Sequence, residues 1–139
     1  MGRVTVEAKI ESVKDLYAVE LGVLPAEEAR QVIIAEALVD TGATLLSLPS
    51  KIIAALGLKQ VSLKRVIASS GPTHAGLYEA VRLTIMDRSC TMDVLEVPDG
   101  VPALIGQIPL EHLDFVVDLR SQKLVGNPAH GGEHIYEMY

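Results

Sequence analysis

The residues best suited to chemistry in this chain are Asp40, Thr41 and Gly42, within the stretch ALVDTGATLLSLP at positions 37–49. Apolar runs on both sides predict that Asp40 lies at the end of a buried strand, where little water reaches it. An isolated buried carboxylate is costly and tends to keep its proton. Proteins retain such a group when a partner shares the proton, or when its altered acidity serves a reaction. The pattern therefore indicates general acid–base catalysis.

A plainer interpretation of the same three residues is a turn. The Asp40 carboxylate would then bond nearby backbone N–H groups, while Gly42 supplies a positive φ. Three residues of such common types occur together by chance in many proteins. The apolar segments around them are what favour the catalytic interpretation.

The elements that must position these residues are predicted to be mostly strands. Apolar runs that alternate or are rich in β-branched residues predict strands at 3–10, 16–24, 31–39, 61–68, 76–86, 90–97, 102–106, 115–119 and 123–126. Two short helices are expected, at 49–57 and at 109–114, each with a Pro at its first position. We therefore expect an all-β domain, either a closed barrel or a folded-over sheet.

Composition excludes several classes of protein. The chain has 139 residues, of which 49% are apolar, and this predicts one domain with a sizeable core. A net charge of −6 without a basic cluster argues against a nucleic-acid partner, because phosphates would be repelled. The single Cys90 cannot form an internal disulfide, and charges interrupt every apolar stretch before it reaches membrane-spanning length. We expect a cytoplasmic protein without a membrane partner.

Two motifs, LVDTGA at 38–43 and LIG at 104–106, resemble those of the retropepsin-like aspartic proteases, especially the bacterial single-domain kind. In that family the first motif carries the catalytic Asp, and the second packs behind it before a short helix. A hairpin lies between them here, where the family has its flap. The resemblance covers roughly residues 30–126 and implies a single-domain retropepsin-like barrel that needs no metal or organic cofactor.

The family's reaction requires two carboxylates. One, ionised, takes a proton from water, while the other, protonated, polarises the scissile carbonyl. Two close carboxylates share a proton and titrate as a pair, as aspartic proteases illustrate. Since the chain has one Asp-Thr-Gly, the second carboxylate must come from another copy. We expect a homodimer with a single two-fold site and an inactive monomer.

The resemblance also assigns roles to individual residues. Asp40 corresponds to the catalytic Asp, and Thr41 to the Thr whose hydroxyl reaches the other subunit's loop. Gly42 allows close backbone approach, and its N–H helps to hold the carboxylate. Ala43 and Thr44 are expected to line the floor or first pocket for substrate. The flap tip, which closes over substrate, corresponds to Ser69, Ser70, Gly71, Pro72 and Thr73.

The sequence departs from the retroviral pattern after LIG. Gln107 and Ile108 stand where those proteases often carry an Arg and an acid or amide that tie the dimer together. Other contacts must then hold the dimer. We expect a protease domain at 1–126 and a tail at 127–139 that is either frayed or part of the dimer interface. The apolar tail residues are Ile135, Tyr136, Met138 and Tyr139.

Other reactive residues carry weaker signals. His130 and His134 have the spacing of metal ligands on a helix, but two intervening glycines argue against a helix, so no metal site is expected. Cys90 is expected to be a small core residue rather than a nucleophile.

We therefore expect an aspartic endopeptidase that acts on extended peptides, with a preference for apolar side chains. One alternative is a dimeric module of the same fold that grasps peptides or a protein without cutting them. Another is a structural subunit in which Asp40 only stabilises a turn. The intact Asp-Thr-Gly favours catalysis, since a binding module has no need of paired acids.

Overall fold

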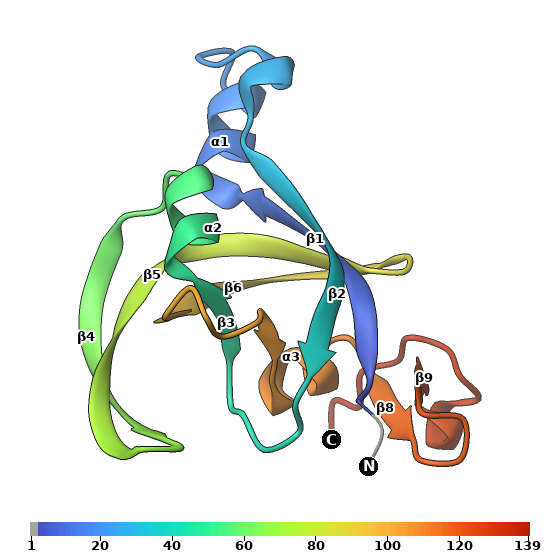
Figure 1. Cartoon of the computed structure of the whole chain (residues 1–139). Helices are drawn as coiled ribbons and strands as arrows, with labels where there is room; N and C mark the ends of the chain where they lie inside the picture. Colours follow the sequence, from blue (N-terminus) through green and yellow to red (C-terminus); the bar gives the residue numbers. More distant parts are fainter. Residues whose placement is uncertain (1–2) are drawn as a thin grey trace.

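The computed structural model describes residues 3–139 and shows a closed β-barrel (Figure 1). Its six strands are β1 (Thr5–Ser12), β2 (Gln31–Val39), β3 (Leu46–Pro49), β5 (Gly71–Ile85), β6 (Arg88–Val97) and β7 (Leu104–Ile105). They follow the order β1-β2-β7-β3-β6-β5, and β5 closes the ring by pairing antiparallel with β1. The expected all-β retropepsin-like barrel is confirmed. The first two residues of the predicted domain at 1–126 lie outside the described part.

A seventh strand, β4 (Gln60–Ala68), extends the sheet beyond the ring by pairing with β5. β5 has 15 residues and pairs with three strands: its first part with β4, its last part with β1, and the stretch from Leu77 to Ile85 with β6. A register shift between Tyr78 and Val81 separates the two parts. As a result the β4–β5 hairpin arcs away from the barrel, with its turn at the same end as the loop after β2 (Figure 1).

Aliphatic side chains fill the barrel, as the composition predicts. The largest fully buried ones from the strands are Ile10, Leu46, Leu48, Val81, Leu83, Ile85, Val94 and Ile105. The expectation that the strand before Asp40 is buried holds for only part of β2 within the single chain, because Ile33 in its first half is 60% exposed. The buried residues of this strand, Ala37 and Val39, lie at its C-terminal end. The segment that leads into Asp40 is therefore the part of β2 anchored in the core.

The strand predicted at 16–24 is absent, because most of this segment belongs to helix α1 (Val13–Glu20) and the turn after it. Ser12 caps the helix, and its hydroxyl accepts a hydrogen bond from the backbone N–H of Asp15 at 3.3 Å. The Asp15 side chain lies in the first turn, where a carboxylate is favourable. The 3-10 turn η1 (Ala26–Glu28) then leads to β2.

An ion pair anchors α1 to the start of β2. The Asp15 carboxylate, in a residue only 4% exposed, accepts hydrogen bonds from Arg30 Nε at 2.8 Å, Arg30 Nη2 at 3.0 Å and the Arg30 backbone N–H at 2.9 Å. These bonds hold the pKa of the Asp15 carboxyl below its ordinary value. The carboxylate thus stabilises the folded state at pH values above that ordinary value.

We expect Asp15→Asn to lower the free energy of unfolding by about 1–3 kcal/mol at neutral pH, because it weakens charged hydrogen bonds to Arg30. Urea denaturation measures this. The difference from wild type must disappear as the pH falls through the lowered pKa of Asp15, where the wild-type carboxylate is itself protonated. The exposed Glu28→Gln is the matched control in the same segment. A difference that persisted at strongly acid pH would contradict the assignment.

The remaining helices are α2 (Ser50–Ala55) and α3 (Gln107–His112), which match the two predicted ones, and the C-terminal hairpin is β8 (Phe115–Asp118) with β9 (Lys123–Gly126). With α1, the described chain has three short α-helices rather than one or two. None of the described helices is both long and apolar enough to cross a membrane. The 3-10 turn η2 (Pro128–His130) directs the tail toward the end of α3, where His130 contacts Asp114.

Candidate active site

The position of β7 between β2 and β3 determines the course of the Asp-Thr-Gly loop, which we define as residues 40–45. β7 is parallel to β2, with Val39 opposite Ile105. It is antiparallel to β3, with Leu46 opposite the same Ile105. The strands before and after the Asp-Thr-Gly loop are therefore separated by one that comes much later in the chain. The loop has to cross over the end of β7.

Backbone hydrogen bonds hold the Asp-Thr-Gly loop from behind. The N–H of Asp40 donates to the carbonyl of Ile105 at 3.0 Å, which extends the pairing of β2 with β7. At the start of α3, the N–H of Gln107 donates to Ala43 O at 2.8 Å, and that of Ile108 to Thr44 O at 2.9 Å. The first N–H groups of a helix lack partners within it, so the loop carbonyls satisfy them. The loop and α3 thereby immobilise each other.

At Gly106 the chain after β7 comes very close to the backbone of the Asp-Thr-Gly loop. The Gly106 N–H donates to Leu45 O at 3.1 Å. A Cβ at this position would lie 2.5 Å from Leu45 O and 2.6 Å from Ala43 O, and neither backbone atom can move independently. Only glycine fits there. This is the physical reason for the glycine of the LIG motif, which packs behind the loop.

The Asp40 side chain is half-buried, so the expectation of a poorly solvated carboxylate is wrong for the single chain. The reason is that burial of β2 ends with Val39, and Asp40 stands just beyond the core. Its Oδ1 accepts a hydrogen bond from the Gly42 N–H at 3.0 Å. Both the turn and the catalytic interpretation include this bond, so it does not separate them.

The other residues predicted around Asp40 lie beside it. Thr41, Gly42 and Thr44 are exposed, and Ala43 is half-buried. The carbonyls of Ala43 and Thr44 accept hydrogen bonds from the start of α3, so these two carbonyls are not available to a ligand. The contacts predicted for these residues with substrate or a second subunit stay predictions.

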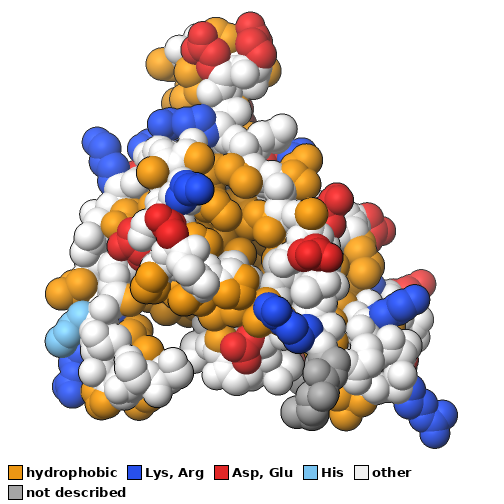
Figure 2. All heavy atoms as spheres, viewed as in Figure 1, with side chains coloured by type: hydrophobic (Ala, Val, Ile, Leu, Met, Phe, Trp, Pro, Cys, Tyr) orange, Lys and Arg blue, Asp and Glu red, His pale blue; other side chains and the backbone are white. Residues whose placement is uncertain are grey.

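The predicted flap tip is tighter than SSGPTH suggests. Ala68 pairs with Gly71, so the turn consists of Ser69 and Ser70 alone. Pro72 and Thr73 already belong to β5, and Gly71 has a φ of 112°, which favours glycine. Figure 2 shows a notch between this end of the hairpin and the body that carries the loop after β2.

A cleft of about 530 Å³ opens beside the carboxylate. Asp40 and Thr41 are on its wall, together with Gln107 from the start of α3. The rest of the lining is almost entirely apolar and comprises Val4, Leu38, Val39, Leu110, Phe115, Val116, Val117 and Leu119, with Arg3 as the one basic residue. Asp40 is the only acidic residue in the lining.

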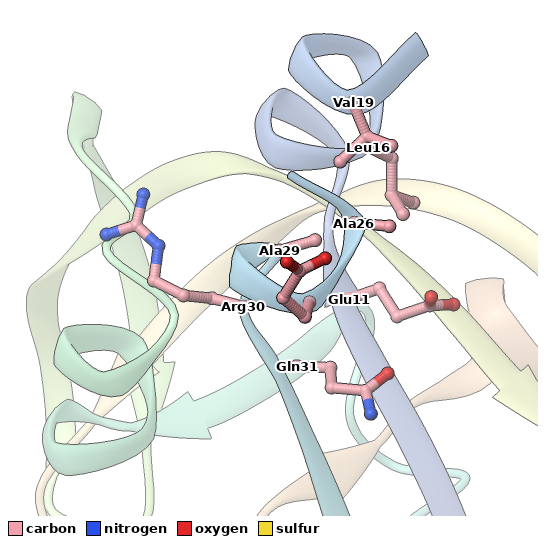
Figure 3. Close-up of a pocket in the computed structure, with 8 residues that line it drawn as sticks. Glu11, Leu16, Val19, Ala26, Ala29, Arg30 and Gln31 are labelled. Atoms are coloured by element: carbon pink, nitrogen blue, oxygen red, sulfur yellow. The ribbon is translucent and has the colours of Figure 1, made fainter. Parts of the chain in front are cut away.

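A second, smaller pocket of about 230 Å³ lies between α1, η1 and the adjoining ends of β1 and β2 (Figure 3). Leu16, Val19 and Ala26 form its apolar side, and none of its lining residues belongs to the Asp-Thr-Gly loop. The one buried acid there, Glu11, already accepts a hydrogen bond from Arg82 at 2.9 Å. We assign this pocket no chemistry.

Other reactive groups lie away from the Asp-Thr-Gly loop. Cys90 is buried, and burial raises the pKa of its thiol to about 11, so at neutral pH it is not the thiolate that a nucleophile needs. Within residues 3–139 no group of three or more His, Cys, Asp or Glu side chains is arranged to hold a metal ion. Sequence reasoning missed the clustering of His112, His130 and His134 around the end of α3, because it depends on the fold of the tail.

The closed barrel, with an Asp-Thr-Gly loop backed by a crossing strand and a glycine, defines a retropepsin-like aspartic protease. A family model described as aspartyl protease matches residues 18–108, and the chain belongs to this family. That match includes the Asp-Thr-Gly loop, the β4–β5 hairpin and Gly106. The comparison with curated proteins finds no match.

Proposed function

We propose that this protein is an aspartic endopeptidase whose active site forms when two copies associate around a two-fold axis between their Asp40 side chains. The observation that carries the proposal is the Asp-Thr-Gly loop, held from behind by β7 and α3 while its carboxylate lies at an open cleft. The reaction requires two carboxylates, and the lining of this cleft contains one.

The surroundings of Asp40 support association of two copies. Val116 and Val117 are half-buried on the cleft wall, and Leu119 at its edge is 79% exposed. A second copy that covered these residues would remove apolar surface from water, which favours association. It would also exclude water from the carboxylates and so promote proton sharing. We place the exposed apolar tail residues, Tyr136, Met138 and Tyr139 among them, in the same interface.

The proposed chemistry follows from a pair that holds one proton. The ionised Asp40 of one copy takes a proton from water as the water oxygen bonds to the scissile carbonyl carbon. The protonated Asp40 of the other copy gives its proton to the carbonyl oxygen. The tetrahedral intermediate then collapses. The first Asp40 gives the proton it took from water to the amide nitrogen, and the C–N bond breaks. The second Asp40 takes a proton from one hydroxyl of the intermediate as the C=O bond re-forms, so that a carboxyl and an amine are released. The pair again holds one proton.

The substrate we propose is an extended peptide lying between Asp40 and the β4–β5 hairpin. Ser69, Ser70, Gly71, Pro72 and Thr73 would close over it and exclude water. We propose that the site prefers substrates with apolar side chains, because its binding pockets would be built from Leu, Ile and Val. No metal or organic cofactor enters the reaction. We propose the cytoplasm as the compartment, in keeping with a lone free cysteine.

The direct test incubates the purified chain with a peptide library from acid to neutral pH, with and without a statine-type inhibitor, and measures its mass by sedimentation. Inhibitor-sensitive cleavage by a dimer supports the proposal. A tight dimer that binds peptides but cuts none would instead identify the non-catalytic module. An active monomer would contradict the shared site.

A further inference from the structure

The C-terminal strap, defined here as residues 127–139, folds back onto one carboxylate at the end of α3. Asp114 is 7% exposed, and its Oδ2 accepts a hydrogen bond from the Ile135 N–H at 3.1 Å. The Asn127 N–H donates to the Asp114 carbonyl at 3.0 Å, and Asn127 Nδ2 donates to Asp114 Oδ1 at 3.3 Å. His130 Nδ1 lies 2.7 Å from the same Oδ2. Asp114 is therefore the anchor of the strap.

His130 bridges two carboxylates. While Nδ1 faces Asp114, Nε2 lies 2.8 Å from Glu137 Oε1. An ionised carboxylate can only accept hydrogen bonds, and a neutral imidazole carries a single N–H. Both contacts are hydrogen bonds only when His130 is an imidazolium with two N–H groups. With both carboxylates ionised, the geometry favours the protonated form of His130.

The other charged and titratable groups near this bridge come from three elements. Arg88 of β6 donates to the Leu113 and Asp114 carbonyls and to Gly132 O, and its charge does not change in this pH range. His112 of α3 and His134 of the strap lie against Tyr136, whose hydroxyl donates to His112 O at 2.7 Å. His130 contacts two carboxylates, those of Asp114 and Glu137, and among the described residues no ion pair with a carboxylate is found for the other groups near this bridge.

The shifts in acidity agree with this geometry. The hydrogen bonds that His130 donates, to Glu137 first and then to Asp114, raise the pKa of His130 above its ordinary value of 6.5. The hydrogen bond with His130 is the largest cause that lowers the pKa of Asp114 below its ordinary value of 3.8. The His130 contribution to docking is complete below the ordinary histidine value and is lost as the pH rises through its raised one. The Asp114 contribution is lost as the pH falls through its lowered value.

We propose that the strap is a proton-controlled element, docked while His130 is an imidazolium and released over residues 135–139 when His130 loses its proton. The contacts of Arg88 and Asn127 do not titrate, so the start of the strap stays in place. Release frees Tyr136 and uncovers the end of α3. Leu110 of α3 and Phe115 of β8 line the Asp40 cleft. Release of the strap from the end of α3 would therefore alter the surroundings of two elements that form the cleft wall.

The test uses the full-length Asp40→Asn chain, so that no self-cleavage interferes and the result does not depend on peptide hydrolysis. NMR follows the titration of the His130 ring and the hydrogen-exchange protection of the Ile135 amide between pH 5 and 9. We expect His130 to titrate above 6.5, with protection of Ile135 lost at the same midpoint. Glu137→Gln should lower that midpoint, because the ring loses a charged acceptor.

Two further variants sharpen the test. His130→Gln cannot become a cation, so its Ile135 protection should not change between pH 5 and 9. Glu133→Gln, a neighbouring exposed strap residue, should titrate like wild type. Titration of His130 at or below 6.5, or protection of Ile135 that is unchanged through the His130 midpoint, would overturn the proposal.

Discussion

Asp40→Asn is expected to reduce peptide hydrolysis at least about a thousand-fold while leaving the fold intact, because the amide can neither take nor give the catalytic proton. The side chain keeps its size, and its Oδ1 can still accept the Gly42 N–H that Asp40 binds at 3.0 Å. The measurement is kcat/KM on the best library peptide, with circular dichroism and the urea midpoint as checks on folding.

The matched control for this substitution is Asp93→Asn. Asp93 is exposed on β6 and is not followed by Thr-Gly. Its replacement should leave hydrolysis and stability unchanged. If both variants cut peptides at wild-type rates, Asp40 is not the catalyst, and the turn interpretation would hold.

A mixing experiment separates a shared site from an independent one. When wild-type and Asp40→Asn chains are co-expressed in equal amounts and pair at random, about a quarter of the dimers carry two intact carboxylates. Total activity should therefore fall to about a quarter of that of an equal amount of wild-type dimer. Activity near one half would mean that each chain works alone.

Gly106→Ala is expected to lower the free energy of unfolding by about 3 kcal/mol and to abolish most hydrolysis. The new Cβ would lie 2.5 Å from Leu45 O and 2.6 Å from Ala43 O. Both contacts are with backbone, so no flexible side chain can relieve them. Either the Asp-Thr-Gly loop or the start of α3 must shift, and the Asp40 carboxylate would shift with the loop.

Gly100→Ala is the control, because nothing lies within 4 Å of the position where its Cβ would be. Urea denaturation compares the two alanine variants, and kcat/KM is measured where each remains folded. Wild-type stability and activity in Gly106→Ala would show that the loop does not depend on its backing strand.

Most of the strands were predictable because each is determined by residues close together in the chain. β2 at 31–39 and the C-terminal hairpin show the expected apolar patterns, and LVDTGA is enough to predict the candidate site. The apolar pattern of 16–24 favours a strand, but most of this segment belongs to helix α1 and the turn after it, because a capping residue precedes the segment. The signal that could have found it is Ser12 followed by Asp15, which favours a helix start.

The residues of the candidate site could be predicted from the sequence, but the strand register and the burial around them could not. The spacing of SSGPTH could not show that the hairpin turn narrows to Ser69 and Ser70, because strand register depends on both partner strands. Likewise, apolar neighbours in sequence suggested a buried Asp40. Its half-buried state follows from where β2 leaves the core, and that depends on contacts with distant segments.

A β-rich domain with an Asp-Thr-Gly loop and a glycine motif can be inferred from the residues alone, because local spacing and side-chain chemistry are enough to specify these features. The insertion of β7 between β2 and β3, the contact of Gly106 with the loop and the bridge from Asp114 through His130 to Glu137 are visible only in the folded chain. Each of these is a contact between segments brought together by closure of the barrel and return of the strap, and no local pattern encodes it.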